Sequence, residues 1–167
     1  MSPRLPTAAI VLGIAGLVPF VFLAIAALSV QNPSESARFL LALVAYGGVV
    51  LAFLGGIHWG FVLHPVLPEG LTTDARRDAT RLGLGVVPSL IGWAALLTPL
   101  FGVPEIGLAV LIVGYLGTII GEHHLRRRGA LLPAGFMALR WALSIVVLAV
   151  LITVLALRLI GAKITFL

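Results

Sequence analysis

The chain has 167 residues, of which 60% are hydrophobic and 10% are charged, and its formal net charge is +5. Soluble domains carry about 25% charged residues, so this composition excludes a soluble globular protein and predicts one membrane-embedded domain over residues 1–167. The lack of cysteine excludes disulfides and thiolate metal sites, and the arginines lie in short loops without the continuous basic face that nucleic-acid binding requires.

Five apolar runs have about the length, ~20 residues, that a helix needs to cross the hydrocarbon layer of a membrane. They predict an all-α bundle of five transmembrane helices, at about residues 7–30, 39–63, 82–101, 104–124 and 134–160. The first run has a pattern like a signal-peptide cleavage site at residues 24–26, but it is longer than a signal core, and we expect it to be retained.

Prolines, glycines and charged residues mark the breaks between these runs. Turns are predicted at residues 32–34 and 102–104, and polar loops at residues 64–81 and 126–129. Thr73 or Asp74 is suited to cap a short helical lead-in to the third span. Pro133 suits the first turn of the fifth span, because a missing N–H is tolerated there.

The placement of lysine and arginine predicts the orientation, because cytoplasmic loops carry an excess of these residues. Eight cationic side chains are expected on the side of the N-terminus: Arg4, Arg76, Arg77, Arg81, Arg126, Arg127, Arg128 and Arg140. Three are expected on the opposite side: Arg38, Arg158 and Lys163. This asymmetry predicts a cytoplasmic N-terminus and a C-terminus outside.

An internal repeat is one interpretation of the first four spans. Shifting the sequence against itself by 69 residues places Pro19 on Pro88 and Tyr46 on Tyr115. This alignment would make a parallel tandem repeat of two helical hairpins, followed by a fifth helix; chance matching of a chain rich in small and aliphatic residues is the alternative. Either way, we expect helix kinks at Pro19 and Pro88, because each proline removes one N–H from its helix.

Several motifs occur in the order typical of one protein family. They are LGIAGLVPF at residues 12–20, YGG at 46–48, FLGGIHWG at 53–60, VPSL at 87–90 with Trp93, and LPA at 132–134 with Leu139-Arg140. On these motifs, which cover nearly the whole chain, the sequence resembles the family called domain of unknown function 3429, which contains bacterial and mitochondrial inner-membrane proteins. The resemblance implies several transmembrane helices and no particular reaction. Gly135-Phe136 departs from the bulkier pair expected at this place.

The membrane setting follows from these observations. The sequence starts at Met1 without the composition of a transit peptide, so we expect a multi-pass protein of the bacterial inner (cytoplasmic) membrane. Arg126, Arg127 and Arg128 lie at the predicted cytoplasmic boundary, where we expect them to contact lipid headgroups.

A small set of polar side chains is predicted to lie in the cytoplasmic half of the bundle. The candidates for a polar pocket are Tyr46, His58, Tyr115, Glu122, His123 and Arg140. His58 lies about 9 Å inside the end of the second span at 1.5 Å per residue, so it can meet Glu122 if the second and fourth spans are neighbours. An unpaired carboxylate inside a bundle is costly, and we therefore predict an ion pair between Glu122 and Arg140.

Three interpretations of this set are open. In the first, the side chains are structural and are satisfied by water, headgroups or arginines. In the second, they form a pocket for a quinone or lipid headgroup, or a proton path, since ionisable groups inside membranes are often functional. In the third, they bind haem or a metal. Haem needs axial histidines buried on facing helices, whereas His123 and His124 lie near a loop. Zinc needs three or four converging ligands. We therefore expect no metal site and no cofactor.

Small residues of the second span fall on one broad face of the predicted helix, and His58 points about a third of a turn away from them. The glycines on this face are Gly48, Gly55, Gly56 and Gly60. Gly56 and Gly60 form a small-xxx-small motif, which lets the backbone of another helix approach closely. We predict that these glycines pack helices within the bundle; an interface with a membrane-protein partner or with a second copy of the chain is the alternative.

The sequence contains no Ser-His-Asp order, paired carboxylates, phosphate-binding loop or dinucleotide fingerprint, and we expect the protein not to be an enzyme. Few polar groups and apolar helix faces favour a non-catalytic accessory subunit or assembly factor of a larger membrane complex. The alternatives are a small transporter or ligand-binding bundle with a pocket near His58 and Glu122, and a quinone- or haem-binding redox protein.

Overall fold

The computed structural model describes residues 6–63, 75–127 and 135–161. Every regular element within these ranges is an α-helix: α1 (Thr7–Ala15), α2 (Val18–Ser29), α3 (Pro33–Leu63), α4 (Ala75–Leu100), α5 (Pro104–Arg127) and α6 (Phe136–Leu159). α1 and α2 together form the first span, and five spans in this part of the chain are long and apolar enough to cross a membrane. The prediction of an all-α, five-span membrane protein is therefore confirmed.

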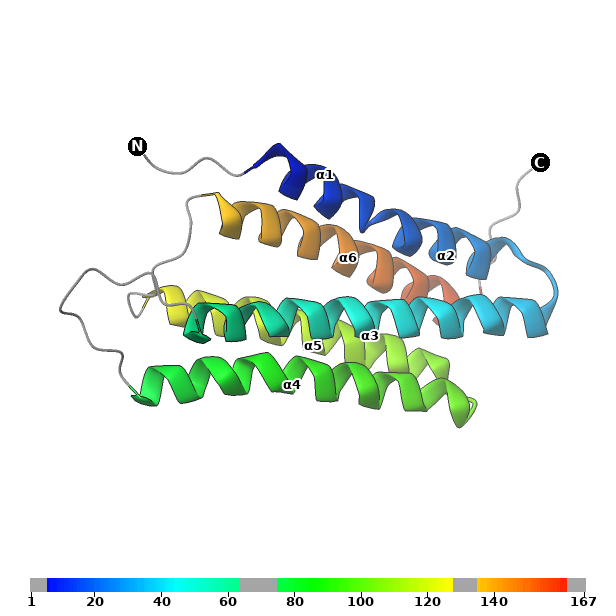
Figure 1. Ribbon diagram of the computed structural model, residues 1–167. Coiled ribbons are helices and arrows are strands. Elements are labelled where there is room, and N and C mark those ends of the chain that lie inside the picture. The colour runs from blue at the N-terminus through cyan, green and yellow to red at the C-terminus, as the bar shows by residue number, and fades with distance from the viewer. Residues whose placement is uncertain (1–5, 64–74, 128–134, 162–167) are drawn as a thin grey trace.

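The spans run side by side along one axis, so the start of α1 and the end of α6 lie at opposite ends of the bundle (Figure 1). α3 is central and packs against α2, α4 and α5. α6 closes the bundle by packing against α5 on one side and the first span on the other. We call the end that holds the start of α1 and the end of α3 the α1 end.

The connection between α2 and α3 is shorter than predicted, because α3 begins at Pro33 and not near residue 39. The Oδ1 atom of Asn32 accepts hydrogen bonds from the Ser34 backbone N–H at 3.1 Å and from the Ser34 hydroxyl at 2.9 Å. This is the arrangement of an asparagine N-cap followed by proline in the first turn. The predicted turn is thus the start of the helix.

α4 also begins earlier than the predicted span, at Ala75, so the expected helical lead-in to the third span is present. The residues proposed to cap it, Thr73 and Asp74, lie outside the described ranges, as does Pro133 before α6.

The predicted tight turn between α4 and α5 is confirmed. Gly102 has φ +78°, and the backbone N–H groups of Gly102 and Val103 donate to the carbonyls of Pro99 and Thr98, each at 3.1 Å. This pattern is a Schellman motif, in which the left-handed position favours glycine. Pro104 then opens α5, where its missing N–H is not needed.

The two aligned prolines have different effects on their helices. The first span is interrupted between Ala15 and Val18, immediately before Pro19, and the hydroxyl of Tyr46 donates to the free carbonyl of Gly16 at 2.9 Å. Pro88 lies inside α4, which is one continuous helix. The first kink is therefore a break between two helices, and the third span has no such break.

The hydrogen bonds of the two aligned tyrosines differ as well. If the chain were a repeat of 69 residues, the Tyr115 hydroxyl would donate to the carbonyl of Gly85, as the Tyr46 hydroxyl donates to that of Gly16. Instead the Tyr115 hydroxyl donates to the carbonyl of Gly47 at 3.0 Å. The internal repeat thus stays a prediction that these contacts do not support.

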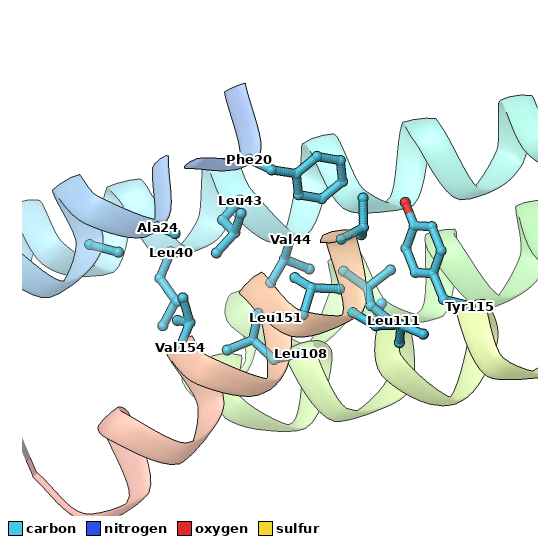
Figure 2. Close-up of a cluster of buried hydrophobic side chains, with 14 of the residues drawn as sticks. Phe20, Ala24, Leu40, Leu43, Val44, Leu108, Leu111, Tyr115, Leu151 and Val154 are labelled. Carbon is cyan, nitrogen blue, oxygen red and sulfur yellow. The ribbon is translucent and has the colours of Figure 1, made fainter. Parts of the chain in front are cut away.

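The core is a set of aliphatic and aromatic side chains mainly on the inner faces of α2, α3, α5 and α6 (Figure 2), to which α4 contributes Ala95. Its fully buried members include Phe20, Leu43, Leu111, Tyr115 and Leu151. The outer faces carry many exposed large hydrophobic side chains, as a protein with lipid as its solvent should. Polar side chains on the inner faces are therefore shielded from both water and lipid.

Candidate functional site: a buried charge cluster and an adjoining cavity

Three ionisable side chains from three helices meet in the half of the bundle nearer the α1 end. His58 of α3, Glu122 of α5 and Arg140 of α6 are 7%, 3% and 5% exposed. Arg140 Nη2 contacts Glu122 Oε1, and His58 Nε2 lies 3.6 Å from the same oxygen. The ion pair expected between Glu122 and Arg140 is present, and the structure brings His58 to it.

The cluster also binds the backbone of α3 through Arg140. Arg140 Nη2 donates to the carbonyl of Leu54 at 2.9 Å, so the guanidinium joins α6 to both α5 and α3. Glu122 Oε2 is buried without a hydrogen-bond donor among the described residues. Removing charges from water costs several kcal/mol per ion, and only opposite charges and hydrogen bonds in good geometry offset this cost. The ion pair therefore depends on good contact geometry to offset the cost of its burial, and it is the main polar feature of the bundle.

The two tyrosines of the predicted pocket link helices through their hydroxyl groups. Tyr115, fully buried, binds α5 to α3 at Gly47. Tyr46, half-buried, binds α3 to the break in the first span at Gly16, and its ring makes an edge contact with Phe20 at a centroid distance of 4.9 Å. Both hydroxyl protons are thus donated to backbone carbonyls.

The remaining histidines near the cluster lie apart from it. The ring of His123 packs beside Trp141 of α6, with centroids 5.9 Å apart, and His124 is exposed, with Nδ1 3.0 Å from the carbonyl of Ile120. His123 does not complete the predicted pocket, because consecutive residues point to different sides of a helix. In the described part of the chain, no three His, Asp or Glu side chains gather as metal ligands.

A cavity of about 470 Å³ adjoins the cluster, between the first span, α3 and α6. Its lining is mainly aliphatic and aromatic; the polar contributions come from Tyr46, Tyr115, Arg140 and Ser144. His58 and Glu122 do not line it, so the pocket expected around these two residues is displaced to the other side of Arg140. The charge cluster joins α3, α5 and α6, and the cavity lies beside it against the interrupted first span, with Gly16 and Leu17 in its lining.

Ser144 is the polar residue of this site that the sequence reasoning missed. It lies four residues after Arg140, hence on the same face of α6, and it is 3% exposed. No hydrogen-bond partner for its hydroxyl occurs among the described side chains and backbone groups. The spacing from Arg140 was the available signal, but serine in a transmembrane helix most often only bonds its own backbone.

The predicted glycine face of α3 is divided between two different environments. A Cβ atom added to Gly48 would lie 2.9 Å from the carbonyl oxygen of Gly92, and one added to Gly55 would lie 2.6 Å from that of Gly85. These two glycines pack the backbones of α3 and α4 together, as predicted. Among the described atoms, a Cβ added to Gly56 or Gly60 meets nothing within 4 Å, so the described part of the bundle does not show the predicted packing for this pair.

The difference follows from helix geometry. At 100° per residue, Gly48 and Gly55 fall on the side of α3 that faces α4, together with Trp59, whose Nε1 donates to the Leu82 carbonyl at 3.3 Å. Gly56 and Gly60 fall nearly a quarter-turn or more further round, on the outward side. The face predicted from the sequence is therefore too broad for all of its glycines to contact one neighbouring helix.

The arginines assigned to lipid headgroups cannot be located as side chains. Arg127 is the last residue of α5 and Arg126 precedes it, but their side chains lie outside the described set, and Arg128 lies outside the described ranges.

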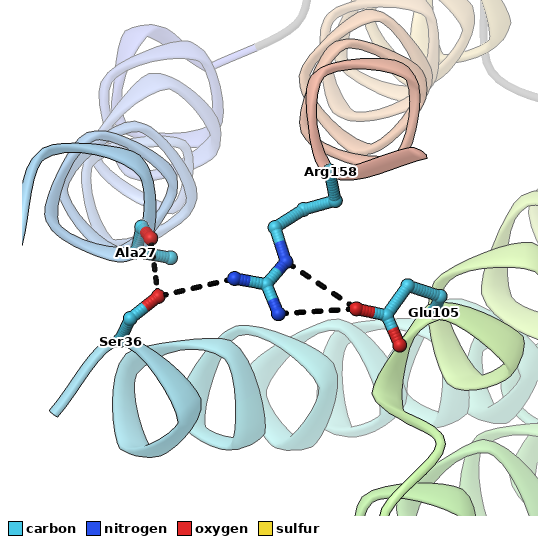
Figure 3. A network of polar contacts seen from close by, with 4 residues as sticks. All are labelled: Ala27, Ser36, Glu105 and Arg158. Carbon is cyan, nitrogen blue, oxygen red and sulfur yellow. Dashed lines mark hydrogen bonds and ion pairs between the residues drawn. The ribbon is translucent and has the colours of Figure 1, made fainter. Parts of the chain in front are cut away.

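A second polar network lies at the opposite end of the bundle (Figure 3). Arg158 of α6 donates to Glu105 Oε1 from Nη2 at 3.1 Å and from Nε at 3.3 Å. Its Nη1 donates to the hydroxyl of Ser36 at 3.3 Å, and that hydroxyl donates to the carbonyl of Ala27 at 2.7 Å. The network thus connects α2, α3, α5 and α6 where the predicted outer side of the membrane begins.

This outer pair is expected to contribute little to stability. The side chains of Arg158 and Glu105 are 29% and 32% exposed, and ion pairs that water reaches contribute only about 0.2–1 kcal/mol. Glu105→Gln is therefore expected to lower the free energy of unfolding by no more than about 1 kcal/mol, measured by denaturation in mixed micelles. A loss comparable to that from breaking the buried pair would contradict this ranking of the two networks.

Comparisons with known proteins agree with this architecture. The family model described as "Protein of unknown function (DUF3429)" matches residues 5–156. Transmembrane protein 69 of Xenopus tropicalis is 36% identical over 143 residues, which cover 84% of this chain and 51% of the frog protein. Transmembrane protein 69 of Mus musculus is 40% identical over 92 residues, which cover 55% of this chain and 34% of the mouse protein.

The chain therefore spans about half of the frog relative's length and less of the mouse relative's. No solved structure matches it. The family model covers nearly the whole chain, including all of α3 and α5 and most of α6, the three helices of the charge cluster. On this evidence the chain belongs to the DUF3429 family of multi-pass membrane proteins.

Proposed function

We propose that the protein is a non-catalytic accessory subunit or assembly factor, which binds a transmembrane helix of a partner protein along the outward side of α3. The observation that carries the proposal is the open notch at Gly56 and Gly60. The buried ionisable groups His58, Glu122 and Arg140 are engaged with one another, so binding through a helix face is the activity that the exposed surface supports best.

The notch is part of a continuous outward stripe on α3. Val49 and Phe53 are exposed on this stripe toward the middle of the helix. Gly56 and Gly60 follow on the same side, and a Cβ atom added to either would meet no atom of another described segment within 4 Å. Two glycines four residues apart form a flat surface, on which a second helix can approach closely enough for backbone and side-chain packing. Phe53 would then border the notch.

The energetics of glycine support the same conclusion. A glycine inside a helix costs about 0.8–1 kcal/mol relative to alanine. Gly48 and Gly55 offset this cost by letting α4 approach, whereas Gly56 and Gly60 gain no contact from the described part of their own chain. A partner helix on this face would supply the missing packing.

The double substitution Gly56→Leu and Gly60→Leu tests the proposal. We expect the variant to fold at least as stably as the wild type, because the side chains enter open space and leucine favours the helix, but to lose its partner. The measurement is the size of the complex after extraction in mild detergent, with quantitative mass spectrometry of co-purified membrane proteins; we expect at least tenfold less partner.

The matched control is Gly117→Leu on α5, where an added Cβ also meets nothing within 4 Å; it should retain the partner. Differently tagged copies of the chain separate a foreign partner from self-association. Recovery of only a second copy, of a lone wild-type monomer, or of undiminished partner with the double variant would each contradict the proposed role.

A further inference from the structure

We propose that the cavity between α1, α2, α3 and α6 binds one acyl chain of a membrane glycerolipid, with the ester carbonyl of the lipid held by Arg140 and Ser144. This inference does not depend on the helix-binding role proposed above, since neither Gly56 nor Gly60 lines the cavity; Phe53 lies between the two sites and borders both. It rests on the shape of the cavity, its unused donors, its charge balance and its depth.

The break in the first span shapes the cavity. α2 packs against both α3 and α6, whereas α1 packs against α6, and Figure 1 shows the first span diverging from α3 toward the α1 end. The Tyr46 hydroxyl holds the break at Gly16, at the narrow end of the resulting wedge. The volume of about 470 Å³ falls in the range of about 300–1,000 Å³ typical of sites for small organic ligands.

The polar groups of the lining can donate hydrogen bonds to a ligand. Ser144 is buried and its hydroxyl has no partner in the described structure. Arg140, one helical turn away, contacts Glu122 and Leu54 through Nη2, and its other N–H groups make no hydrogen bond with the described residues. An arginine has five N–H donors, so most of them remain. The Tyr46 and Tyr115 protons are already donated to carbonyls. The head of a ligand must therefore carry acceptor oxygens.

The charges beside the cavity favour a ligand whose hydrogen-bond acceptor is uncharged. Glu122 already contacts Arg140, so the positive charge at the cavity has its counterion. A carboxylate or phosphate placed beside Arg140 would bring a second negative charge close to the buried Glu122, and like charges in a medium of low dielectric constant repel strongly. An uncharged ester carbonyl accepts the same hydrogen bonds without this cost.

The depth of the site matches the order of groups in a lipid leaflet. Arg140 lies three residues, or about 4.5 Å, inside the apolar stretch that begins at Met137, and the lining extends along α6 to Val147, a further 10 Å or so toward the membrane centre. Donors thus lie near the interface and the apolar walls lie deeper. Lipid ester groups and acyl chains follow the same sequence from interface to hydrocarbon.

Photocrosslinking with a defined lipid tests the inference. The purified protein is reconstituted with phosphatidylcholine that carries a diazirine on one acyl chain, and crosslinked peptides are located by mass spectrometry. We expect labelling of the cavity walls on α1, α3 and α6 well above that of Val113, which lies on the lipid-exposed side of α5. Equal labelling of both regions would show ordinary surface lipid and would overturn the inference.

Two adjacent positions supply a matched pair of variants. Ala9 lines the cavity and Ala8 does not; Ala9→Phe should reduce cavity labelling at least fivefold, and Ala8→Phe should leave it unchanged. Ser144→Ala, which keeps the shape but removes one neutral hydrogen bond, should weaken lipid binding about threefold to tenfold. Unchanged labelling in both Ala9→Phe and Ser144→Ala would contradict the assignment.

Extraction of the natively purified protein identifies the occupant. A co-purifying glycerolipid that is lost in Ala9→Phe supports the inference. A stoichiometric quinone or free fatty acid in its place would overturn the choice of ligand, and both would be distinguished by mass in the same experiment.

Discussion

Gly55→Leu is expected to destabilise the bundle by about 3 kcal/mol, at the upper end of the usual cost of overpacking. The side chain would enter the contact between α3 and α4, where even a Cβ atom lies 2.6 Å from the Gly85 carbonyl oxygen and 3.1 Å from a ring carbon of Pro88. A backbone carbonyl and a proline ring cannot turn away as a flexible side chain can, so the two helices must separate.

The neighbouring residue provides the control. Gly56→Leu adds the same side chain to the same helix one position later, where an added Cβ meets nothing within 4 Å in the described part of the chain, and it is expected to leave the free energy of unfolding unchanged or raise it by up to about 1 kcal/mol through helix propensity. Unfolding in mixed micelles measures both variants. Equal destabilisation would mean that the helix, and not its contact with α4, is sensitive to substitution.

Arg140→Met is expected to cost about 3–5 kcal/mol, because it leaves Glu122 buried without its cationic partner. Glu122 is 3% exposed, and its second carboxylate oxygen already lacks a donor among the described residues. His58, at 3.6 Å, is too distant to replace a direct guanidinium contact. The effect should appear as a large loss of folded protein after extraction.

The double variant Glu122→Leu with Arg140→Met separates the cost of an orphaned charge from the value of the pair. Apolar replacements of a buried ion pair are often neutral or stabilising, so we expect the double variant to be more stable than Arg140→Met alone. The coupling energy from the double-mutant cycle should exceed that of Arg158 and Glu105, whose side chains are partly exposed. Additive losses would show that the two side chains act independently.

The two proposals engage different parts of the same helix. The partner-helix notch lies on the outward side of α3, the lipid cavity lies where α3 faces the first span, and Phe53 lies at the border between them. Variants at Gly56 and Gly60 should therefore leave lipid labelling intact, and Ala9→Phe should leave the co-purified partner intact.

The sequence by itself determined the elements that depend on local chemistry. Long apolar runs set the number of spans, and the turn before Pro104 was predicted because glycine adopts the left-handed conformation with little strain. The pairing of Glu122 with Arg140 was also predictable, since few cations within a bundle can neutralise a buried carboxylate. The break in the first span was foreshadowed by Pro19, because a proline removes one helical hydrogen bond.

Tertiary structure alone decided how each face of a helix is used. The glycines of α3 share a broad face on a helical wheel, but only the positions of the neighbouring helices separate Gly55, packed on α4, from Gly56, which is open. The cavity likewise depends on the divergence of α1 from α3, and no local pattern encodes the space between two helices. Periodicity determines which residues share a side of a helix, whereas packing in three dimensions determines what that side meets.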